Sequence, residues 1–135
     1  MVEVRAAVSD QDAIAIHRML MQNGHEIAIA PVNPVKVMQE VYGLIKADAG
    51  AATLMAMDGD ELVGVLGLVQ VPFWYSDDHL IMDRIFYVLP ANRGTAGRRL
   101  VSAARSIADG AKQILMIAQT NPTRRPKVLV FHPRS

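Results

Sequence analysis

The 135-residue sequence contains no cysteine, which excludes disulfide bonds, thiolate metal sites and cysteine nucleophiles. The formal net charge is only +1, so no overall field favours nucleic acid or an anionic membrane surface. No apolar run reaches the roughly 18 residues of a membrane span. Residues 1–5 lack the cationic and apolar regions of a signal peptide. We therefore expect a cytoplasmic protein that binds neither nucleic acid nor membrane.

The residues that are present are typical of a folded domain. Hydrophobic residues make up 51% of the chain and charged residues 20%, a balance found in globular rather than disordered proteins. A length of 135 residues allows one sizeable core but not two. We therefore predict a single domain over residues 1–135.

The spacing of apolar residues predicts strands and helices in the order β, α, α, β, β, β, α, β. Ser9 with Asp12 is typical of a capping box at the start of the first helix, which is expected to run to about Asn23 and to be ended by Gly24. Residues 25–33 are expected to be a loop, and residues 128–131 fit either strand or helix. This order predicts an α/β fold, a mixed sheet with antiparallel hairpins beside one parallel crossover. The expected strands cover residues 2–7, 51–58, 61–71, 81–89 and 114–118, and the expected helices cover residues 9–23, 33–50 and 97 onward.

Residues 81–100 are the most informative segment. Their pattern predicts an apolar strand, a Pro/Asn turn, a loop of small residues and a helix that begins near Gly97. Such a turn directs main-chain N–H groups and the positive end of a helix dipole at one point, where a phosphate or pyrophosphate binds well. Gly94, Ala96 and Gly97 let an anion approach the main chain, while Arg93 and Arg98 add positive charge. An ordinary strand-to-helix turn is the alternative.

This order of elements resembles the GNAT (Gcn5-related N-acetyltransferase) superfamily, in particular its compact, often phage-encoded members. The resemblance covers roughly residues 2–121 and implies a GNAT-like mixed, mostly antiparallel sheet flanked by helices. The chain leaves little room for the family's last two strands, so we expect a shortened C-terminal end. The similar segments are residues 4–7 followed by Asp12, the hairpin at residues 58–64, the strand ending at residues 87–94, and the loop at residues 93–100.

The resemblance implies that acetyl-CoA is bound as a co-substrate, mostly by main-chain groups. In the family the fourth and fifth strands splay apart, and the pantetheine arm lies in the gap like a further strand. A strand-four amide would bind the thioester oxygen. By this resemblance the arm would contact Phe86, Tyr87, Val88 and Asn121, and the diphosphate would lie on the N–H groups of Arg93, Gly94, Thr95, Ala96, Gly97 and Arg98.

The resemblance further implies an N-acetyltransferase in which a primary amine attacks the thioester directly within a ternary complex. Asp83, at the expected start of strand four, is the candidate base, unless it is solvated or pairs with Arg84. Tyr87 is a candidate proton donor, unless it only packs across the sheet. Phe131 occupies the position where compact members usually carry a Tyr that protonates the departing thiolate, and a phenylalanine side chain has no exchangeable proton to donate. The alternative is a non-catalytic CoA-binding or protein-interaction module.

The acceptor and the assembly stay open at this stage. The acceptor is expected to be a small-molecule or peptide amine, and a shortened sheet edge favours a homodimer. Residues 73–75, which are aromatic, would either line an acceptor pocket or form an interface. His79 beside Asp77 and Asp78 is more typical of solvated residues than of a metal site, so no metal is assigned. The basic residues at 124, 125 and 127 are candidates for the 3′-phosphate of CoA or a plain basic tail.

Overall fold

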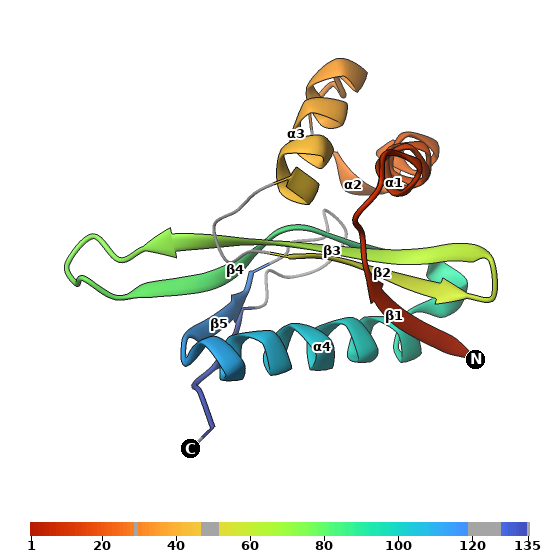
Figure 1. The fold of residues 1–135 in the computed structure, drawn as a ribbon. Coiled ribbons are helices and arrows are strands. Elements are labelled where there is room, and N and C mark those ends of the chain that lie inside the picture. Colours follow the sequence, from red (N-terminus) through yellow and green to blue (C-terminus); the bar gives the residue numbers. More distant parts are fainter. Residues whose placement is uncertain (29, 47–51, 119–127, 135) are drawn as a thin grey trace.

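The fold is known from a computed structural model, which describes residues 1–28, 30–46, 52–118 and 128–134. Figure 1 shows the elements in chain order. They are β1 (Val2–Ala6), α1 (Asp10–Gln22), α2 (Gly24–Ile27), α3 (Pro34–Lys46), β2 (Thr53–Asp58), β3 (Glu61–Pro72), β4 (His79–Val88), the short 3₁₀ helix η1 (Pro90–Asn92), α4 (Thr95–Ala111), β5 (Ile114–Ile117) and β6 (Leu129–Phe131).

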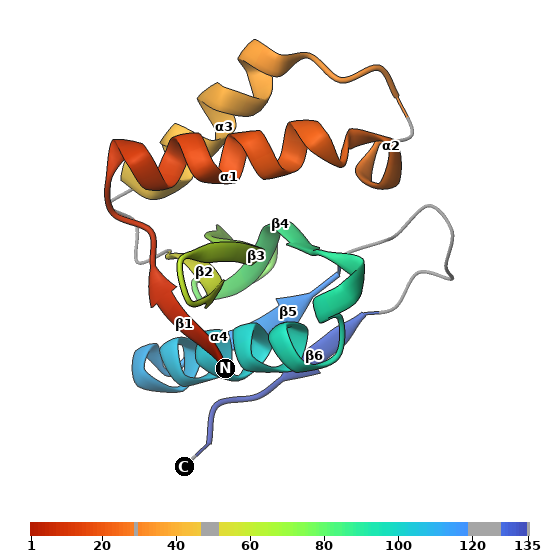
Figure 2. The same cartoon turned by 90° about the vertical axis from the view of Figure 1, so that its right-hand side faces the viewer.

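The described residues form one six-stranded sheet with the strands in the order β1-β2-β3-β4-β5-β6. Neighbouring strands are antiparallel except β4 and β5, which run parallel. Helix α4 supplies the crossover between these two strands and covers one face of the sheet, while α1, α2 and α3 lie on the other face (Figures 1 and 2). The predicted α/β fold with a mixed, mostly antiparallel sheet flanked by helices is confirmed.

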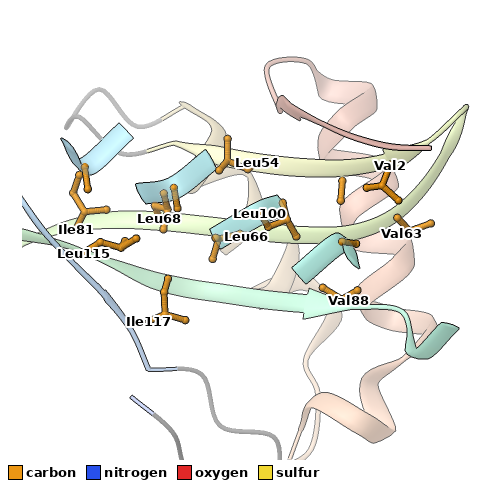
Figure 3. Close-up of a cluster of buried hydrophobic side chains, with 14 residues drawn as sticks. Val2, Leu54, Val63, Leu66, Leu68, Ile81, Val88, Leu100, Leu115 and Ile117 are labelled. Atoms are coloured by element: carbon orange, nitrogen blue, oxygen red, sulfur yellow. The ribbon is translucent and has the colours of Figure 1, made fainter. Parts of the chain in front are cut away.

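A hydrophobic core lies on each face of the sheet. Between the sheet and α4, Leu100 of the helix packs among Leu66 and Leu68 of β3 and Leu115 of β5 (Figure 3). On the other face, α1 and α3 pack against alternate residues of β2, β3 and β4, among them Met55, Val65 and Tyr87. Because β3 is covered on both faces, its residues 63–68 are all buried, which explains its nearly continuous apolar sequence.

Local capping chemistry sets the helix boundaries. Ser9 and Asp12 form the reciprocal capping box that opens α1, as the sequence predicted. The predicted end of this helix at about Asn23 is confirmed, since α1 ends at Gln22 with Asn23 as its C-cap, and the Asn23 side chain donates to the Met19 carbonyl oxygen at 2.8 Å. Gly24 instead begins α2, so part of the segment predicted as a loop is helical.

Two further boundaries differ from the sequence prediction. Helix α4 begins at Thr95 rather than near Gly97, since Gly94 adopts a φ of 94° and starts the helix two residues early. Residues 129–131, left open between strand and helix, form β6 and pair with β5. The C-terminal end was expected to be short, and among the described residues β6, 3 residues long, is the strand that follows β5. Pairing of a second copy along the β6 edge stays a prediction.

The Asp12 carboxylate accepts hydrogen bonds from three residues, so its substitution tests how much these contacts stabilise the junction between β1 and α1. Its carboxylate accepts hydrogen bonds from Arg5 at 2.9 and 3.1 Å and from the Val8 and Ser9 amides. The Arg5 hydrogen bonds, more than any other contact, hold the pKa of this carboxyl well below its ordinary value. We expect Asp12→Ala to lower the free energy of unfolding by about 1–3 kcal/mol at pH 7, measured by urea denaturation.

The pH dependence follows from the lowered pKa. The stabilisation is fully present above the unfolded-state pKa of about 3.9 and is lost as pH falls through the lower folded-state pKa. Asp12→Asn should therefore flatten the fall in stability below about pH 4. Asp10→Asn is the matched control, because Asp10 lies in the same first turn but pairs only with exposed Lys46, at 3.4 Å. An equal effect of both substitutions would contradict this assignment.

Candidate functional site

The site is built around a fork in the sheet. Strands β4 and β5 pair only from Leu80 with Ile114 to Met82 with Met116. On its other edge β5 pairs with β6, whereas β4 continues to Val88 with β3 as its neighbour on one side. Among the residues that the structure describes, no strand pairs with the other edge of the second half of β4, in keeping with the splayed strands that the GNAT resemblance implied.

A β-bulge and a carboxylate hold the fork open. The β3–β4 register shifts from Gly67 opposite Ile85 to Leu68 opposite Asp83, which leaves Arg84 as the extra residue of β4. Asp83 Oδ1 accepts a hydrogen bond from the Ala118 amide at 2.7 Å, just where the ladder to β5 stops. Asp83 thus lies in the middle of β4 rather than at its start, and Arg84 pairs with Glu40 of α3 rather than with Asp83.

The register decides which main-chain groups of β4 face the gap. The Leu89 amide donates to the Val63 carbonyl oxygen at 2.9 Å, and bonding alternates along an antiparallel ladder. Tyr87 therefore directs its main-chain groups toward β3, while Phe86 and Val88 direct theirs into the gap. Of the three residues proposed from sequence to contact a pantetheine arm through main chain, we expect Phe86 and Val88 to do so.

The first turn of α4 faces the same gap. Its amides at Thr95, Ala96 and Gly97 have no acceptor within the helix, and Gly94 offers no side chain to cap them. The Arg98 amide is already bonded to the Gly94 carbonyl oxygen at 3.2 Å, and its Nε bonds the same oxygen at 2.9 Å. The methyl group of Ala96 is fully buried in the core. The open donors thus come from residues 94–97, fewer than the six residues predicted from the sequence.

A cleft of about 970 Å³ lies between the fork in the sheet and the helices α1, α2 and α3. Its walls are mostly apolar, and the charged residues that line it are Glu26, Lys36, Glu40, Asp83, Arg84 and Arg93. Among the residues predicted to bind the cofactor, those that line the cleft are Phe86, Tyr87, Val88, Arg93, Gly94 and Gly97. Thr95, Ala96 and Arg98 belong to the adjoining turn, and Asn121 lies outside the described residues, as do the basic residues at 124, 125 and 127.

Three side chains meet at the C-terminal end of the β4 edge. The Tyr87 ring is buried, and its hydroxyl donates to Glu26 Oε2 at 2.5 Å. Arg93 Nη2 donates to the same oxygen at 3.0 Å, and the guanidinium lies 5.8 Å from the Tyr87 ring centre. Burial first, and then the Glu26 carboxylate, raises the pKa of Tyr87 to about 12. The Tyr87 hydrogen bond and the Arg93 charge lower the pKa of Glu26.

Glu26 is the member of this cluster that the sequence did not reveal. It lies in α2, inside the stretch predicted as an aperiodic loop, and Tyr87 is 61 positions further along the chain. A four-residue helix has too few positions to show a period, so no local pattern marks this carboxylate. Only the packing of α2 over the end of β4 brings the two side chains together.

Other predicted residues lie away from the cleft. Phe131 packs beside α4, with its ring centre 4.7 Å from the Arg105 guanidinium carbon. Trp74 is 94% exposed at the end of the β3–β4 hairpin, which extends well beyond the helices in Figure 1. None of residues 73–75 lines the cleft. An acceptor pocket built from these aromatic residues is thus not supported by their position, and an interface role stays a prediction.

The described residues were considered for a metal-ion site and for a membrane-spanning helix. Among the described residues no group of three or more His, Asp or Glu side chains is placed to hold a metal ion. Within that same part of the chain, every helix is too short or too polar to cross a bilayer.

The Tyr87–Glu26 contact has a direct spectroscopic test. A phenol with a pKa of about 12 stays protonated until well above its ordinary value of about 10. The stabilisation it confers is complete below about pH 10 and is lost as pH rises toward 12. In an ultraviolet titration at alkaline pH, we expect Tyr87→Phe to remove the phenolate step near pH 12. Tyr75→Phe, at an exposed position, should leave that step in place; its survival in Tyr87→Phe would refute the assignment.

Comparison with known proteins rests on structure. No protein-family model matches this sequence, and no curated protein matches it either. Solved structures do match, at 11–22% sequence identity. A GNAT family acetyltransferase from Brucella melitensis in complex with acetyl-CoA superposes with a TM-score of 0.69 and 16% identity, covering 100% of this chain and 91% of its own.

Two further structures show the same similarity. A GNAT family acetyltransferase from Staphylococcus aureus covers 99% of this chain and 98% of its own, with a TM-score of 0.66 and 11% identity. A transcriptional regulator from Bacillus halodurans covers 92% and 85%, with a TM-score of 0.69 and 22% identity. With its sheet order, forked strands and helix after β4, the chain therefore has the fold of the GNAT acetyltransferase superfamily.

Proposed function

We propose that this protein is an acetyl-CoA-dependent N-acetyltransferase that acts on a small-molecule or peptide amine. The observation that carries the proposal is the open edge of β4 lying beside the free amides of the first turn of α4. One of the structural relatives, from Brucella melitensis, is a complex with acetyl-CoA. A groove that offers both strand-like main chain and a helix N-terminus suits a ligand with an amide-containing arm and a diphosphate.

In this proposal the two halves of the cofactor use different parts of the groove. The pantetheine amides would bond to the main-chain groups of Phe86 and Val88, and the diphosphate would lie on the amides of residues 94–97. A gap-facing β4 amide would also stabilise the thioester oxygen as negative charge develops there. Most of the binding is thus assigned to main chain, which needs no particular side chain.

The proposed reaction is a direct transfer within a ternary complex. The amine nitrogen attacks the thioester carbonyl carbon, the new C–N bond forms, and the C–S bond breaks to release the CoA thiolate. The amine must lose a proton and the thiolate gains one. Asp83 lines the cleft and is the proposed base. Tyr87 is the proposed proton donor, and its phenol stays protonated at neutral pH.

Asp83 and Tyr87 are expected to contribute unequally to the rate of the transfer. A phenol with a pKa of about 12 transfers its proton poorly to a thiolate, whose acid has an ordinary pKa of about 8.5. Asp83 lines the cleft and is proposed to accept a proton rather than to donate one, so this limit does not apply to it. We therefore assign the larger effect to Asp83 and a small one to Tyr87.

A second function has one observation in its favour. Phe131 carries no hydroxyl and packs on Arg105, so the tail residue that compact GNAT members use as an acid has no counterpart there. A non-catalytic CoA-binding or protein-interaction module would need only the groove. Calorimetry with acetyl-CoA, followed by free-thiol release over a panel of amines, separates the two. Binding with turnover supports the transferase, and binding without turnover supports the module.

The amides of α4 can be tested one at a time. Thr95 occupies the first position of the helix, where proline is well tolerated but supplies no N–H. We expect Thr95→Pro to weaken acetyl-CoA binding by about tenfold or more, because a hydrogen bond to a charged group is worth about 1.5–3 kcal/mol. Thr95→Ala keeps the N–H and should change affinity less than about twofold. Equal affinity of the two variants in calorimetry would show that the diphosphate lies elsewhere.

The substitution Asp83→Asn separates the hydrogen bond that Asp83 accepts from Ala118 from its proposed role as a base. Asparagine keeps an oxygen that can accept from the Ala118 amide but cannot take a proton. We expect Asp83→Asn to lower kcat by about 10²–10⁴-fold with little change in acetyl-CoA affinity. Tyr87→Phe should lower kcat by less than about tenfold. Asp78→Asn, on the distant hairpin, is the control. Full activity of Asp83→Asn would remove Asp83 from the chemistry.

A further inference from the structure

One side chain already occupies the groove that the cofactor is proposed to use. Arg93 Nε donates to the Val88 carbonyl oxygen at 3.1 Å. The β4 register directs that carbonyl into the gap, away from β3. The guanidinium therefore satisfies a main-chain acceptor that a second strand-like neighbour of β4 would otherwise bind.

Arg93 is held in this place by more than one contact. Its Nη2 donates to Glu26 Oε2 at 3.0 Å, and its guanidinium carbon lies 5.8 Å from the centre of the Tyr87 ring. The side chain is 32% exposed and lines the cleft next to Gly94 and Gly97. It thus lies in the passage between the β4 edge and the first turn of α4, rather than pointing away from the molecule.

A strand-like arm that lies along this edge and bonds to the Val88 carbonyl oxygen would compete with Arg93 Nε, which already donates to that oxygen. If the arm displaces the guanidinium, Glu26 loses the Arg93 ion pair and keeps the Tyr87 hydroxyl. The carboxylate is then free to pair with another positive group that enters the cleft.

We propose that Arg93 is an internal occupant of the pantetheine groove, and that its displacement by the cofactor turns Glu26 into the binding site for the acceptor's ammonium group. This inference rests on the proposed function. It makes Glu26 a positioning residue, and it assigns as acceptor a protonated primary amine on an apolar chain, which matches the apolar walls of the cleft. Cofactor must then bind before the acceptor.

The other carboxylates of the cleft do not change partners in this way. Glu40 pairs with Arg84, away from the gap-facing main chain of Val88. Asp83 Oδ1 is bonded to the Ala118 amide, which belongs to the fork itself. Glu26 alone among these three shares its cation with a main-chain group that the cofactor would claim.

The displacement can be followed directly in the full chain by ¹H–¹⁵N spectra of the arginine Nε–H groups, with Arg93→Lys used to assign the Arg93 signal. Pantetheine, which lacks a diphosphate, should move this signal. ADP, which carries a diphosphate but no pantetheine, should leave it in place. A shift with ADP and none with pantetheine would overturn the proposal and make Arg93 an ordinary diphosphate ligand.

Affinity gives a second and independent readout. Glu26→Gln removes the charge that holds Arg93 in the groove, so acetyl-CoA should bind about two- to fivefold more tightly than to the wild-type chain. Glu40→Gln is the matched control, a cleft carboxylate paired with another arginine, and should not change acetyl-CoA affinity. Unchanged or weaker binding by Glu26→Gln would overturn the proposal.

The acceptor site is tested with n-hexylamine on protein saturated with CoA, which has no acetyl group to transfer. Wild-type chain and Glu40→Gln should bind the amine at least tenfold more tightly than Glu26→Gln, and the CoA-free wild type should bind it as weakly as Glu26→Gln. Equal binding by all forms would overturn the assignment of Glu26. If the wild type binds no acetyl-CoA at all, the proposed function itself fails; binding of acetyl-CoA with no effect of Glu26→Gln refutes only this inference.

Discussion

The structure depends on the loss of one strand neighbour partway along β4. Main-chain N–H and C=O groups must find partners, and within the described part of the chain those of Phe86 and Val88 have no strand beside them on the side away from β3. The bulge at Arg84 bends the strand at this point, and the bond from the Ala118 amide to Asp83 closes the fork behind it. The chain thus carries a length of exposed sheet edge inside a cleft, where another protein molecule cannot easily pair with it.

The rest of the fold supports this edge. Helix α4 is fixed to the sheet by a fully buried row that includes Ala96, Leu100 and Ala104, so its first turn cannot move away from the end of β4. The helices of the other face bring Glu26 over Tyr87, and the resulting hydrogen bond ties α2 to the strand that carries the open groups. Rigid elements on both sides therefore surround a gap that is itself made of main chain.

The sequence predicted the parts of this arrangement that depend on local chemistry. The apolar runs of β2 and β3, the Asp58-Gly-Asp60 hairpin and the Ser9–Asp12 cap each involve residues close in the chain, and each was recovered. The sequence did not predict the early start of α4, because Gly94 adopts a positive φ and no neighbouring residue indicates it. The sequence did not reveal Glu26 either, because its partner Tyr87 lies 61 positions away. The position of Asp83 in the middle of β4 depends on a register shift between β3 and β4.

A binding groove made from the peptide backbone has a consequence for how such a protein can change over generations. Any residue supplies an amide and a carbonyl, so substitutions at positions such as Phe86 or Val88 leave the hydrogen-bonding pattern intact as long as the strand keeps its path. Such an edge can keep its shape while its sequence changes, and a solved GNAT structure with 11% identity does superpose on this chain with a TM-score of 0.66. The contact between Glu26 and Arg93 is different, because it depends on the identity of both side chains and is lost when either one is replaced.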